Sequence, residues 1–308
     1  INAASPGDTV RVATGTYTYP RITPAAPDYV DAPIIMKSGV CLEGAGIDQT
    51  IITVPGTWGI YMSGVSYATI KSLTVKGSGH LKPGSGGGVS DGGGIFITNS
   101  NNVQLESCRL TDNSENNGGG LAVLYSSGVA VSRCLIDRNY ARNVGGGVSV
   151  GASSVNLTNV TIANNAASYA VGGLYYSSGS AITLKNSILW ANLGDRGFFS
   201  FSSVQSTVSY SDIGSSADIG ESVSGTGNIK ANPFFVSITD YNLQSTSPVI
   251  NAGDPSLFDT DGSRSDMGAY PLLGATTSTT APTTATTATT TAATTTTASS
   301  TATTSTAT

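Results

Sequence analysis

Charged residues are scarce in this sequence of 308 residues. Lysine and arginine total 14, aspartate and glutamate total 19, and charged residues make up 11% of the chain, against roughly 25% in an average globular protein. The formal net charge of −5 leaves no basic surface for nucleic acid, and no run of lysine or arginine suits an anionic membrane surface. We therefore expect neither partner, and we expect a fold that repeats small side chains at tight corners.

Long apolar segments are also missing. No apolar run approaches the roughly 20 residues that a membrane-spanning helix needs, so we predict no membrane span. No signal peptide is present. The chain begins at Ile1 instead of a methionine, and we interpret it as a processed or partial product.

Cysteine and histidine are almost absent. Cys41, Cys108 and Cys134 are an odd number, which gives no disulfide framework, and their spacing matches no metal site. The one histidine, His80, lies in the segment KGSGHLKPGSGGG, where we expect a solvated side chain and not a catalytic one. These residue types therefore predict no cofactor.

Glycine is abundant, and it recurs at a fixed interval. GGGIFI begins at Gly92, GGGLAV at Gly118, GGGVSV at Gly145 and GGLYY at Gly172, so the steps are 26, 27 and 27 residues. Such a period is typical of solenoids, whose units bury their apolar faces only by stacking. Leucine-rich repeats need a leucine-rich consensus that is absent here, and ankyrin and tetratricopeptide units are longer and helical.

A second run within each unit alternates apolar and polar residues around a break. The copies are VQLESCRL from Val103, VAVSRCLI from Val129, VNLTNVTI from Val155 and ITLKNSIL from Ile182. A period of two indicates a strand with one buried face. Aligning the copies gives one interior column of Ile70, Leu105, Val131, Leu157 and Leu184, and a second of Leu73, Cys108, Cys134, Val160 and Ser187. The columns are three positions apart, so we predict a bend between them.

Asparagine forms a third column, three residues after each run. Its members are Asn113, Asn139, Asn165 and Asn192. Asparagine tolerates left-handed corners, and its amide can hydrogen-bond to the neighbour one level away. We predict an asparagine ladder that satisfies buried backbone groups at one corner of each coil. We assign the glycine-rich segments to another corner, where a positive φ is needed.

These columns together predict an all-β fold, a single-stranded parallel β-helix. Each coil of such a solenoid adds about 4.8 Å of height. We expect about nine to eleven coils between Asp8 and Ile250, giving a rod of roughly 45–50 Å.

Three segments resemble a known family. INAASPGDTVRVATGTY, residues Ile1–Tyr17, resembles the first-coil segment of pectin-lyase-like right-handed parallel β-helix proteins. Gly227–Pro255 resembles the last segment of many secreted bacterial and archaeal surface members, and Asp259–Tyr270 resembles their closing turn. The resemblance implies a right-handed β-helix domain over residues 1–274. It implies little about activity, because this group mixes lyases, hydrolases, adhesins and surface proteins.

The first coil departs from the family pattern. In the family the INAA stretch closes a short helix that caps the first coil, whereas this sequence starts inside that stretch. An uncapped coil has an unpaired sheet edge that favours pairing with another chain. We therefore expect self-association, end to end or laterally.

Residues suited to polysaccharide cleavage are few. The pectate lyase pattern of clustered calcium-binding aspartates with an arginine base is absent, as is the polygalacturonase pattern of paired aspartates with Gly-His-Gly. The best catalytic candidates are Asp112, Asp137 and Arg138, since Asp112 and Arg138 align one level apart. Two carboxylates can cleave a glycosidic bond, but we favour a surface ladder of ion pairs.

Two other clusters have a structural and a chemical interpretation. Cys108 and Cys134 occupy adjacent levels, as stacked free thiols that act as small hydrophobes or as a disulfide between levels. Asp259, Asp261 and Asp266 in DTDGSRSD resemble part of a calcium loop. A tight Asp-Gly turn is the interpretation that we favour for these three aspartates.

The last part of the sequence differs from the rest. Residues 275–308 are almost only threonine, alanine and serine, without charge, so they cannot form a core. Such composition with proline is typical of O-glycosylated, mucin-like stalks, and an unmodified linker is the alternative. The candidate O-glycosylation sites are Thr276, Thr277, Thr279, Thr280, Thr283 and Thr284, and two sequons add Asn156 and Asn159 as candidates for N-linked glycans.

These features predict a function outside the cell. We interpret the chain as an extracellular or cell-surface structural or adhesive glycoprotein without enzymatic activity, in its most specific form the repeating subunit of a filament. The alternative is a polysaccharide lyase or glycoside hydrolase. A second alternative is a non-catalytic glycan-binding module, in which tyrosines such as Tyr125, Tyr175 and Tyr176 stack on sugars.

Overall fold

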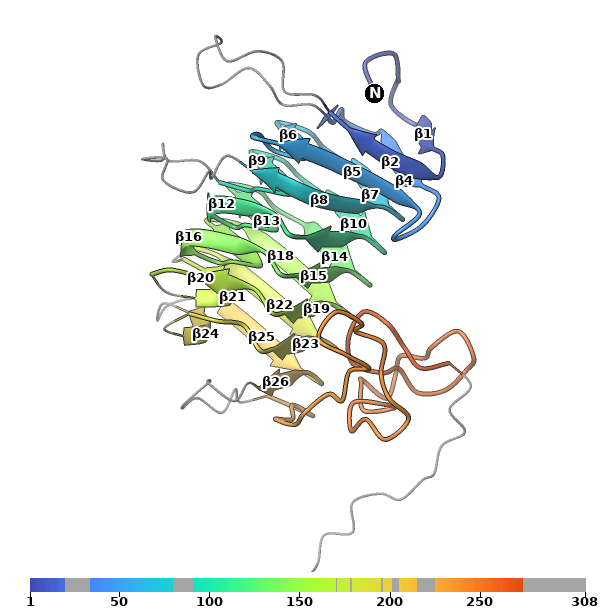
Figure 1. Cartoon of the computed structure of the whole chain (residues 1–308), viewed down its shortest axis with the longest axis vertical. Helices are drawn as coiled ribbons and strands as arrows, with labels where there is room; N and C mark the ends of the chain where they lie inside the picture. The colour runs from blue at the N-terminus through green and yellow to red at the C-terminus, as the bar shows by residue number, and fades with distance from the viewer. Residues whose placement is uncertain are drawn as a thin grey trace, which may run out of the picture. The chain divides into compact units, whose positions relative to one another are not determined.

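The protein is a stack of short parallel strands. A computed structural model describes residues 1–19, 34–79, 91–169, 171–177, 179–194, 196–200, 205–214 and 225–273. Within these ranges the secondary structure consists of strands, turns and bends, without a helix, and strands of successive coils pair in parallel into four sheets (Figure 1). The predicted all-β parallel solenoid is confirmed. In the described ranges no helix is long and apolar enough to cross a membrane.

Each coil contributes strands to two or more of these sheets. Sheet 1 has the order β1 (Thr9–Val12), β4 (Cys41–Gly44), β7 (Thr69–Lys71), β10 (Gln104–Glu106), β14 (Val129–Ser132), β18 (Ser154–Thr158), β22 (Ala181–Lys185) and β25 (Gln205–Ser209). Sheet 2 has the order β2 (Gly15–Thr18), β5 (Thr50–Pro55), β8 (Thr74–Gly79), β11 (Arg109–Thr111), β15 (Leu135–Asp137), β19 (Thr161–Ala163), β23 (Ile188–Trp190) and β26 (Asp212–Gly214). Sheet 3 has the order β24 (Arg196–Ser200), β21 (Val171–Tyr176), β17 (Val148–Gly151), β13 (Leu121–Leu124), β9 (Ile95–Thr98), β6 (Ile60–Ser63) and β3 (Ile34–Ile35). The short sheet 4 contains β12 (Ser114–Asn117), β16 (Tyr140–Val144) and β20 (Ala166–Ala167).

The number of coils is smaller than predicted. Sheets 1 and 2 contain eight strands each within the described residues, so the expectation of nine to eleven coils up to Ile250 was wrong. Among the described residues the last strand, β26, ends at Gly214, and residues 225–273 form turns and isolated bridges. This C-terminal segment contains Pro233, Pro248 and Pro255, and a proline has no N–H to donate to a sheet ladder.

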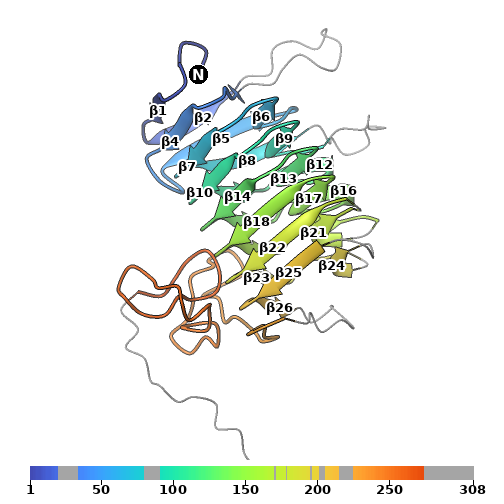
Figure 2. The same cartoon turned by 180° about the vertical axis from the view of Figure 1, so that it is seen from behind.

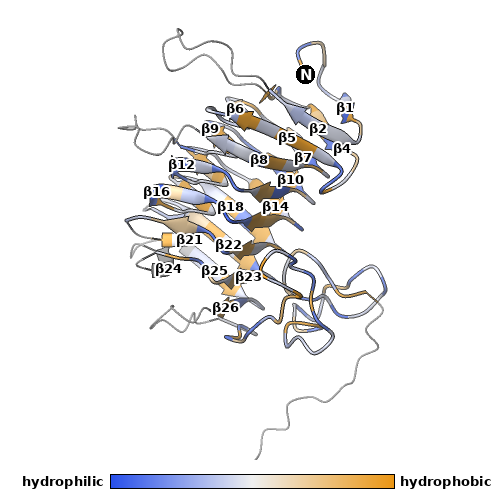
Figure 3. Ribbon diagram, in the orientation of Figure 1, coloured by the Kyte–Doolittle hydropathy of each residue, from blue (hydrophilic) through white to orange (hydrophobic). Residues whose placement is uncertain are grey.

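The first interior column has the predicted register. Leu105 pairs with Ile70 on one side and with Val131 on the other, and the pairing continues from Val131 through Leu157 to Leu184. All five side chains are buried in one continuous core, and each contributes roughly 1.5–3 kcal/mol by leaving water. Figure 3 shows apolar residues recurring along the stacked strands.

The second interior column lies at the bend between sheets 1 and 2. The residue before each member has a left-handed φ, for example 50° at Arg133, which makes the predicted break in each run. All members of this column are buried: Leu73, Cys108, Cys134, Val160 and Ser187.

Two cysteines are neighbours in this column. The Cys134 Sγ accepts a hydrogen bond from the Cys108 N–H at 3.4 Å. Both thiols are free, so the structure shows the stacked thiols and not the disulfide between levels. The contact with Cys134 and burial raise the pKa of the Cys108 thiol.

The asparagine ladder lies at the bend that follows sheet 2. The Asn139 side-chain oxygen accepts hydrogen bonds from the Asn113 N–H and Nδ2, both at 3.0 Å. Asn165 does the same for Asn139, and Asn192 for Asn165. Each Nδ2 also donates to a carbonyl of the preceding coil, as Asn139 does to Leu110 at 2.9 Å. Backbone groups that the bend removes from the sheets are therefore satisfied inside the solenoid.

A serine ladder at the third bend was not predicted. The Ser100 N–H donates to the Ser126 Oγ at 3.1 Å, and the Ser126 N–H donates to the Ser153 Oγ at 2.9 Å. The Ser126 hydroxyl donates to the Leu124 carbonyl, and the Ser153 hydroxyl donates to the Gly151 carbonyl. The serines thus satisfy backbone groups between sheets 3 and 1 as the asparagines do after sheet 2.

The glycine repeats have two structural causes, of which the sequence indicated one. Gly118 has a φ of +65°, as predicted for a corner. Gly119 is needed because of close packing, since a Cβ there would lie 2.3 Å from the Tyr140 carbonyl oxygen one coil away. Coils at this corner therefore approach too closely for any side chain.

The C-terminal segment, residues 225–273, packs on the outer side of sheet 2. Tyr241 and Ala269 contact Leu135 and Ala163 in a small apolar cluster, and the Ala269 N–H donates to Thr161 Oγ1 at 2.9 Å. Both views show the segment beside the last strands of the stack (Figures 1 and 2). It belongs to the compact unit Ile1–Ala275 and shields part of sheet 2 from solvent.

Candidate functional site

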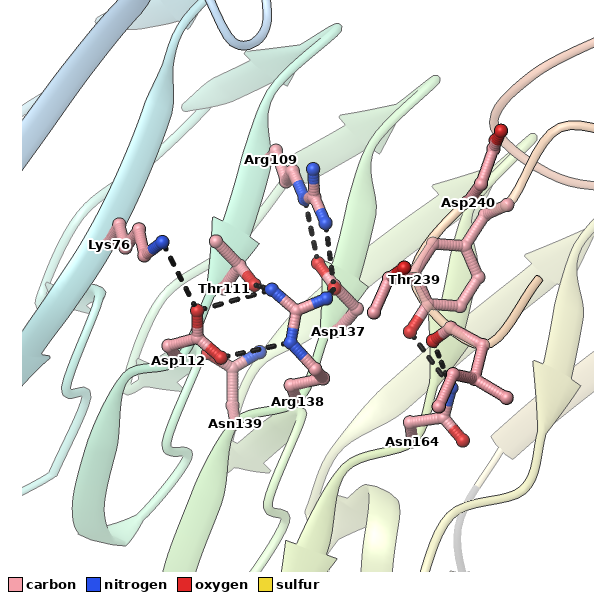
Figure 4. Close-up of polar contacts among 12 residues, drawn as sticks. Lys76, Arg109, Thr111, Asp112, Asp137, Arg138, Asn139, Asn164, Thr239 and Asp240 are labelled. Atoms are coloured by element: carbon pink, nitrogen blue, oxygen red, sulfur yellow. Dashed lines mark hydrogen bonds and ion pairs between the residues drawn. The ribbon is translucent and has the colours of Figure 1, made fainter.

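The predicted catalytic candidates lie together on the outer side of sheet 2. Thr111 of β11 pairs with Asp137 of β15, so Asp112 and Arg138 follow these strands one level apart, as the alignment indicated. We call Asp48, Lys76, Arg109, Asp112, Asp137 and Arg138 the charge network, and Figure 4 shows five of its members.

Asp137 is the buried centre of the charge network, with none of its side chain exposed. Arg109 donates from Nε to Oδ1 at 3.0 Å and from Nη2 to Oδ2 at 3.1 Å. A second cation, Arg138, places Nη1 2.8 Å from Oδ2. Two guanidinium groups therefore hold this carboxylate, which is the arrangement that makes a buried charge tolerable.

Asp112 has a similar environment nearer the surface. Arg138 donates from Nε to Oδ1 at 3.0 Å and from Nη2 to Oδ2 at 3.1 Å, and the Lys76 Nζ lies 3.6 Å from Oδ2. Partial burial raises the pKa of Asp112. The hydrogen bonds and charge of Arg138 and the charge of Lys76 lower the pKa by more than burial raises it, so it lies below its usual value. Asp112 is therefore ionised and paired at neutral pH.

The C-terminal segment covers part of this network. Burial is the main cause of the raised pKa of Tyr241 and Tyr270, and the negative charge of Asp137 contributes to both. The Tyr241 hydroxyl accepts a hydrogen bond from Asn164 Nδ2 at 2.9 Å. The Asp137 side chain is fully buried, so it is not accessible to a polymer that lies along sheet 2.

Glycosidic cleavage needs a carboxylic acid with a raised pKa and a second carboxylate free to act as base or nucleophile. Asp112 and Asp137 each accept bidentate hydrogen bonds from an arginine. Burial lowers the pKa of Arg109, but the hydrogen bond and charge of Asp137 outweigh this effect, so the pKa lies above its usual value. Ion pairs between neighbouring coils therefore occupy both aspartates.

The three C-terminal aspartates build turns. Asp266 accepts hydrogen bonds from the Asn251 N–H at 2.6 Å and the Leu272 N–H at 2.8 Å. Asp259 accepts from the Asp266 N–H, and Asp261 from the Ser263 N–H. In the part of the chain that the structure describes, no group of three or more acidic, histidine or cysteine residues could hold a metal ion. The calcium interpretation of these aspartates therefore has no support in the geometry.

The two sequons differ in their surroundings. Asn156 is exposed on β18. Asn159 lies at the bend, and its Nδ2 donates to Ser265 Oγ at 3.2 Å and to the Asp266 carbonyl at 3.0 Å. A glycan on Asn159 would break the contact that holds the C-terminal segment. His80 and the six threonine candidates of residues 276–284 lie outside the described residues.

The tyrosines of the glycine-rich segments also have different surroundings. Tyr176 is buried in the core, whereas Tyr175 is half-buried and Tyr125 is 67% exposed. Only Tyr125 and Tyr175 therefore keep the predicted capacity to contact a sugar or a neighbouring subunit.

An aromatic cluster on sheet 3 was not predicted from the sequence. The ring of Tyr61 in β6 stacks on Trp58 with centroids 4.8 Å apart and planes at 16°, and Phe96 in β9 lies 5.6 Å from Tyr61 and 5.5 Å from Trp58. We call these three residues the aromatic platform. Tyr61 and Phe96 occupy the same position of the motifs GIYM and GIFI, so the repeat contained a signal for this cluster.

One family model and three solved structures are similar to this chain. The model of the right-handed β-helix region matches residues 36–234. Among solved structures, pectate lyase Pel9A is similar at a TM-score of 0.46 and 16% identity, covering 88% of this chain and 89% of that chain. A pectin methylesterase in complex with hexasaccharide VII has a TM-score of 0.37 and 9% identity, covering 73% and 86%. An alginate lyase from Paenibacillus sp. str. FPU-7 has a TM-score of 0.25 and 13% identity, covering 75% and 93%.

These structural similarities are too low to carry an argument about activity. No match to the chain was found among curated proteins. The family match covers more than half of the sequence, including most of the described strands. The chain therefore belongs to the right-handed β-helix family.

Proposed function

We propose that the chain is an extracellular or cell-surface structural or adhesive glycoprotein, whose most specific form is the repeating subunit of a filament. The observation that carries the proposal is the charge network. The two aspartates with the best placement for catalysis, Asp112 and Asp137, are neutralised by Arg109 and Arg138. The charged groups of this face therefore hold coils together instead of presenting a reactive pair to a substrate.

The tail supports the extracellular assignment by its composition. Residues 275–308 contain threonine, alanine and serine with no charged residue, which suits O-linked glycans on a stalk. A stalk of this kind would hold the β-helix away from a surface and keep it soluble despite its low charge.

The terminal strands of sheets 1 and 2 are the place at which we propose self-association. Strands β1 and β2 are the terminal strands of sheets 1 and 2 within the described residues, and an edge strand presents backbone groups that another strand can pair with. Tyr17 of β2 is 44% exposed, which adds apolar surface to that edge. A second copy of the chain is the partner that we propose there.

Activity and assembly test this proposal together. Purified protein is incubated with uronic-acid polymers and neutral polysaccharides while reducing ends and unsaturated products are measured, and its mass in solution is followed by light scattering. We expect no cleavage and particles that grow with concentration beyond the 31.0 kDa of one chain. Cleavage by the wild type that Asp112→Asn or Asp137→Asn abolishes would establish an enzyme, and a strict monomer at every concentration would exclude the filament.

A further inference from the structure

The last described strand of sheet 2 carries a buried carboxylate. Asp212 of β26 pairs with Ile188 of β23, and the next residue, Ile213, pairs with Leu189. Ile213 packs against the core of the solenoid, so the side chain of Asp212 lies on the outer side of the sheet. Asp212 is nevertheless 0% exposed. An aspartate is almost never buried to this extent unless it is paired.

The C-terminal segment packs directly against Asp212. Ile229 forms a parallel bridge with Asp212, and the Ile213 N–H donates to the Ile229 carbonyl at 3.0 Å. The Ala231 N–H donates to Asp212 Oδ1 at 2.9 Å. Both views show β26 beside this segment (Figures 1 and 2). Asp212 therefore lies at the junction between the stack and the C-terminal segment.

The surroundings of this junction are apolar. Ile188 and Ile229, which both pair with Asp212, belong to one apolar cluster together with Leu243, Val249 and Met267. The second carboxylate oxygen of Asp212, Oδ2, is buried without a hydrogen-bond partner. An ionised carboxylate with an unpaired oxygen is strongly unfavourable in such surroundings, whereas a protonated carboxyl group carries no charge to bury.

No cation compensates Asp212 among the described residues. Burial raises the pKa of Asp212 to about 7, the Ala231 N–H lowers it in part, and no neighbouring charge contributes. The charged or titratable side chains on the elements packed nearby are Lys185, Tyr210, Lys230, Asp254, Arg264 and Asp266. The Lys185 Nζ lies 2.8 Å from Asp254 Oδ2, and Arg264 Nε donates to the Gly253 carbonyl at 2.7 Å. Both cations are thus engaged elsewhere.

We propose that the C-terminal segment is a pH-dependent cover on the outer side of sheet 2, closed while Asp212 is protonated and released when Asp212 ionises. Release brings the carboxylate into water, where its charge is solvated. It also exposes the apolar residues of β15, β19 and β23 against which the segment packs: Leu135, Ala163, Ile188 and Trp190.

The direction of the switch follows from the two pKa values. In the released state Asp212 is in water and regains its ordinary pKa of about 4, whereas in the closed state its pKa is about 7. The closed state therefore binds the additional proton between these values. Closure is most stable below about pH 4, and the opening constant rises by up to about tenfold for each pH unit until Asp212 is ionised in the closed state as well.

The other contacts between the segment and the stack do not titrate in this range. The Ala269 N–H donates to Thr161 Oγ1 at 2.9 Å. The hydrogen bond from Lys185 is the main cause that lowers the pKa of Asp254 to about 2, so this ion pair persists. Burial raises the pKa of Asp266 to about 6, but its two backbone donors belong to the same segment, so release of the segment as a unit leaves them in place.

Hydrogen exchange measured by mass spectrometry on the full chain tests the cover. After correction for the intrinsic exchange rate, peptides within residues 225–273 should give an opening constant that rises at least fivefold from pH 5 to 6 and again from pH 6 to 7. Asp212→Asn has nearly the same shape but cannot ionise, so its constant should stay within twofold. The matched control is Asp240→Asn, in the same segment, whose carboxylate accepts hydrogen bonds from Asn242. It should keep the wild-type profile.

A fluorescence measurement keeps the test decisive if Asp212→Asn fails to fold. Trp58→Phe leaves Trp190 as the one tryptophan of the chain, and Trp190 packs against the C-terminal segment. Acrylamide is a neutral quencher, and its quenching constant for Trp190 should at least double between pH 5 and pH 8.

Three results would each overturn the proposal. One is an opening constant of the segment that does not change with pH in the wild type, or that still rises in Asp212→Asn. Another is an opening constant equal to that of β10 at pH 7, which would show that the segment opens only when the whole stack unfolds. The third is equal quenching of Trp190 at pH 5 and pH 8.

Discussion

The asparagine ladder can be tested at its centre. The change is Asn139→Ala, which removes the amide and keeps the backbone. Four hydrogen bonds disappear: those that Asn139 Oδ1 accepts from Asn113 N–H and Nδ2, and those that Asn139 Nδ2 donates to Leu110 O and Asn165 Oδ1. The Asn139 N–H keeps its own acceptor, because the Asn165 Oδ1 that accepts it remains.

The magnitude follows from the groups that lose a partner. The Asn113 N–H and the Leu110 carbonyl are left short of a hydrogen bond inside the solenoid, since Asn113 and Leu110 are 1% and 0% exposed. A buried polar group left unsatisfied costs about 1–3 kcal/mol. We therefore expect the free energy of unfolding to fall by about 2–4 kcal/mol, and the melting temperature to fall by roughly 4–7 °C.

The assay is urea unfolding followed by far-ultraviolet circular dichroism, with Asn156→Ala as the matched control. Asn156 is the same residue type on the exposed face of β18, where a substitution usually changes stability by less than 0.5 kcal/mol. If Asn139→Ala and Asn156→Ala unfold at midpoints that agree within error, the ladder does not stabilise the bend and this reasoning is refuted.

Three further predictions concern buried charge and close packing. Arg109→Met leaves Asp137 buried with one cation fewer, so we expect the free energy of unfolding to fall by about 3–5 kcal/mol. The double variant Arg109→Met with Asp137→Leu should recover most of this loss. A double variant as unstable as Arg109→Met alone would contradict the ion-pair account. Burial raises the pKa of Asp212 to about 7, above its value in the unfolded chain, so the folded state binds more protons and stability should fall as the pH rises from about 4 to 7, by up to about 4 kcal/mol. Chemical unfolding of Asp212→Asn across that range should show a flatter profile than the wild type, and parallel profiles would disprove the assignment. Gly119→Ala should cost at least about 2 kcal/mol, because its Cβ would meet the Tyr140 carbonyl at 2.3 Å; an unchanged thermal midpoint would show that the coils can separate at that corner.

Much of the coil could be predicted because its causes repeat along the sequence. Asparagine at one position of every unit has one dominant use, so Asn113 and Asn139 indicated both the bend and the hydrogen bonds. Serine is too frequent in this chain for its recurrence to stand out, and the ladder at Ser126 was missed for that reason. The Asp112–Arg138 pair could be found because ion pairs between levels obey the same register.

Features that depend on distant segments could not be predicted in this way. The C-terminal segment packs on β15 through Tyr241 and Ala269, which follow that strand by more than a hundred residues and share no register with it. The end of the regular stack at Gly214 was missed because the C-terminal segment still contains alternating apolar residues, while its prolines prevent a ladder. The aromatic platform unites Trp58, before one strand, with Phe96 in the next, and only the fold brings them together.

The central claim is that this β-helix is displayed outside the cell on a glycosylated tail. Mass spectrometry of proteolytic peptides from the native material tests it most directly. We predict that peptides from residues 275–308 carry hexose mass increments on threonine, while peptides spanning the charge network have the masses of the unmodified sequence. Tail peptides recovered at high coverage with no added mass would contradict the account.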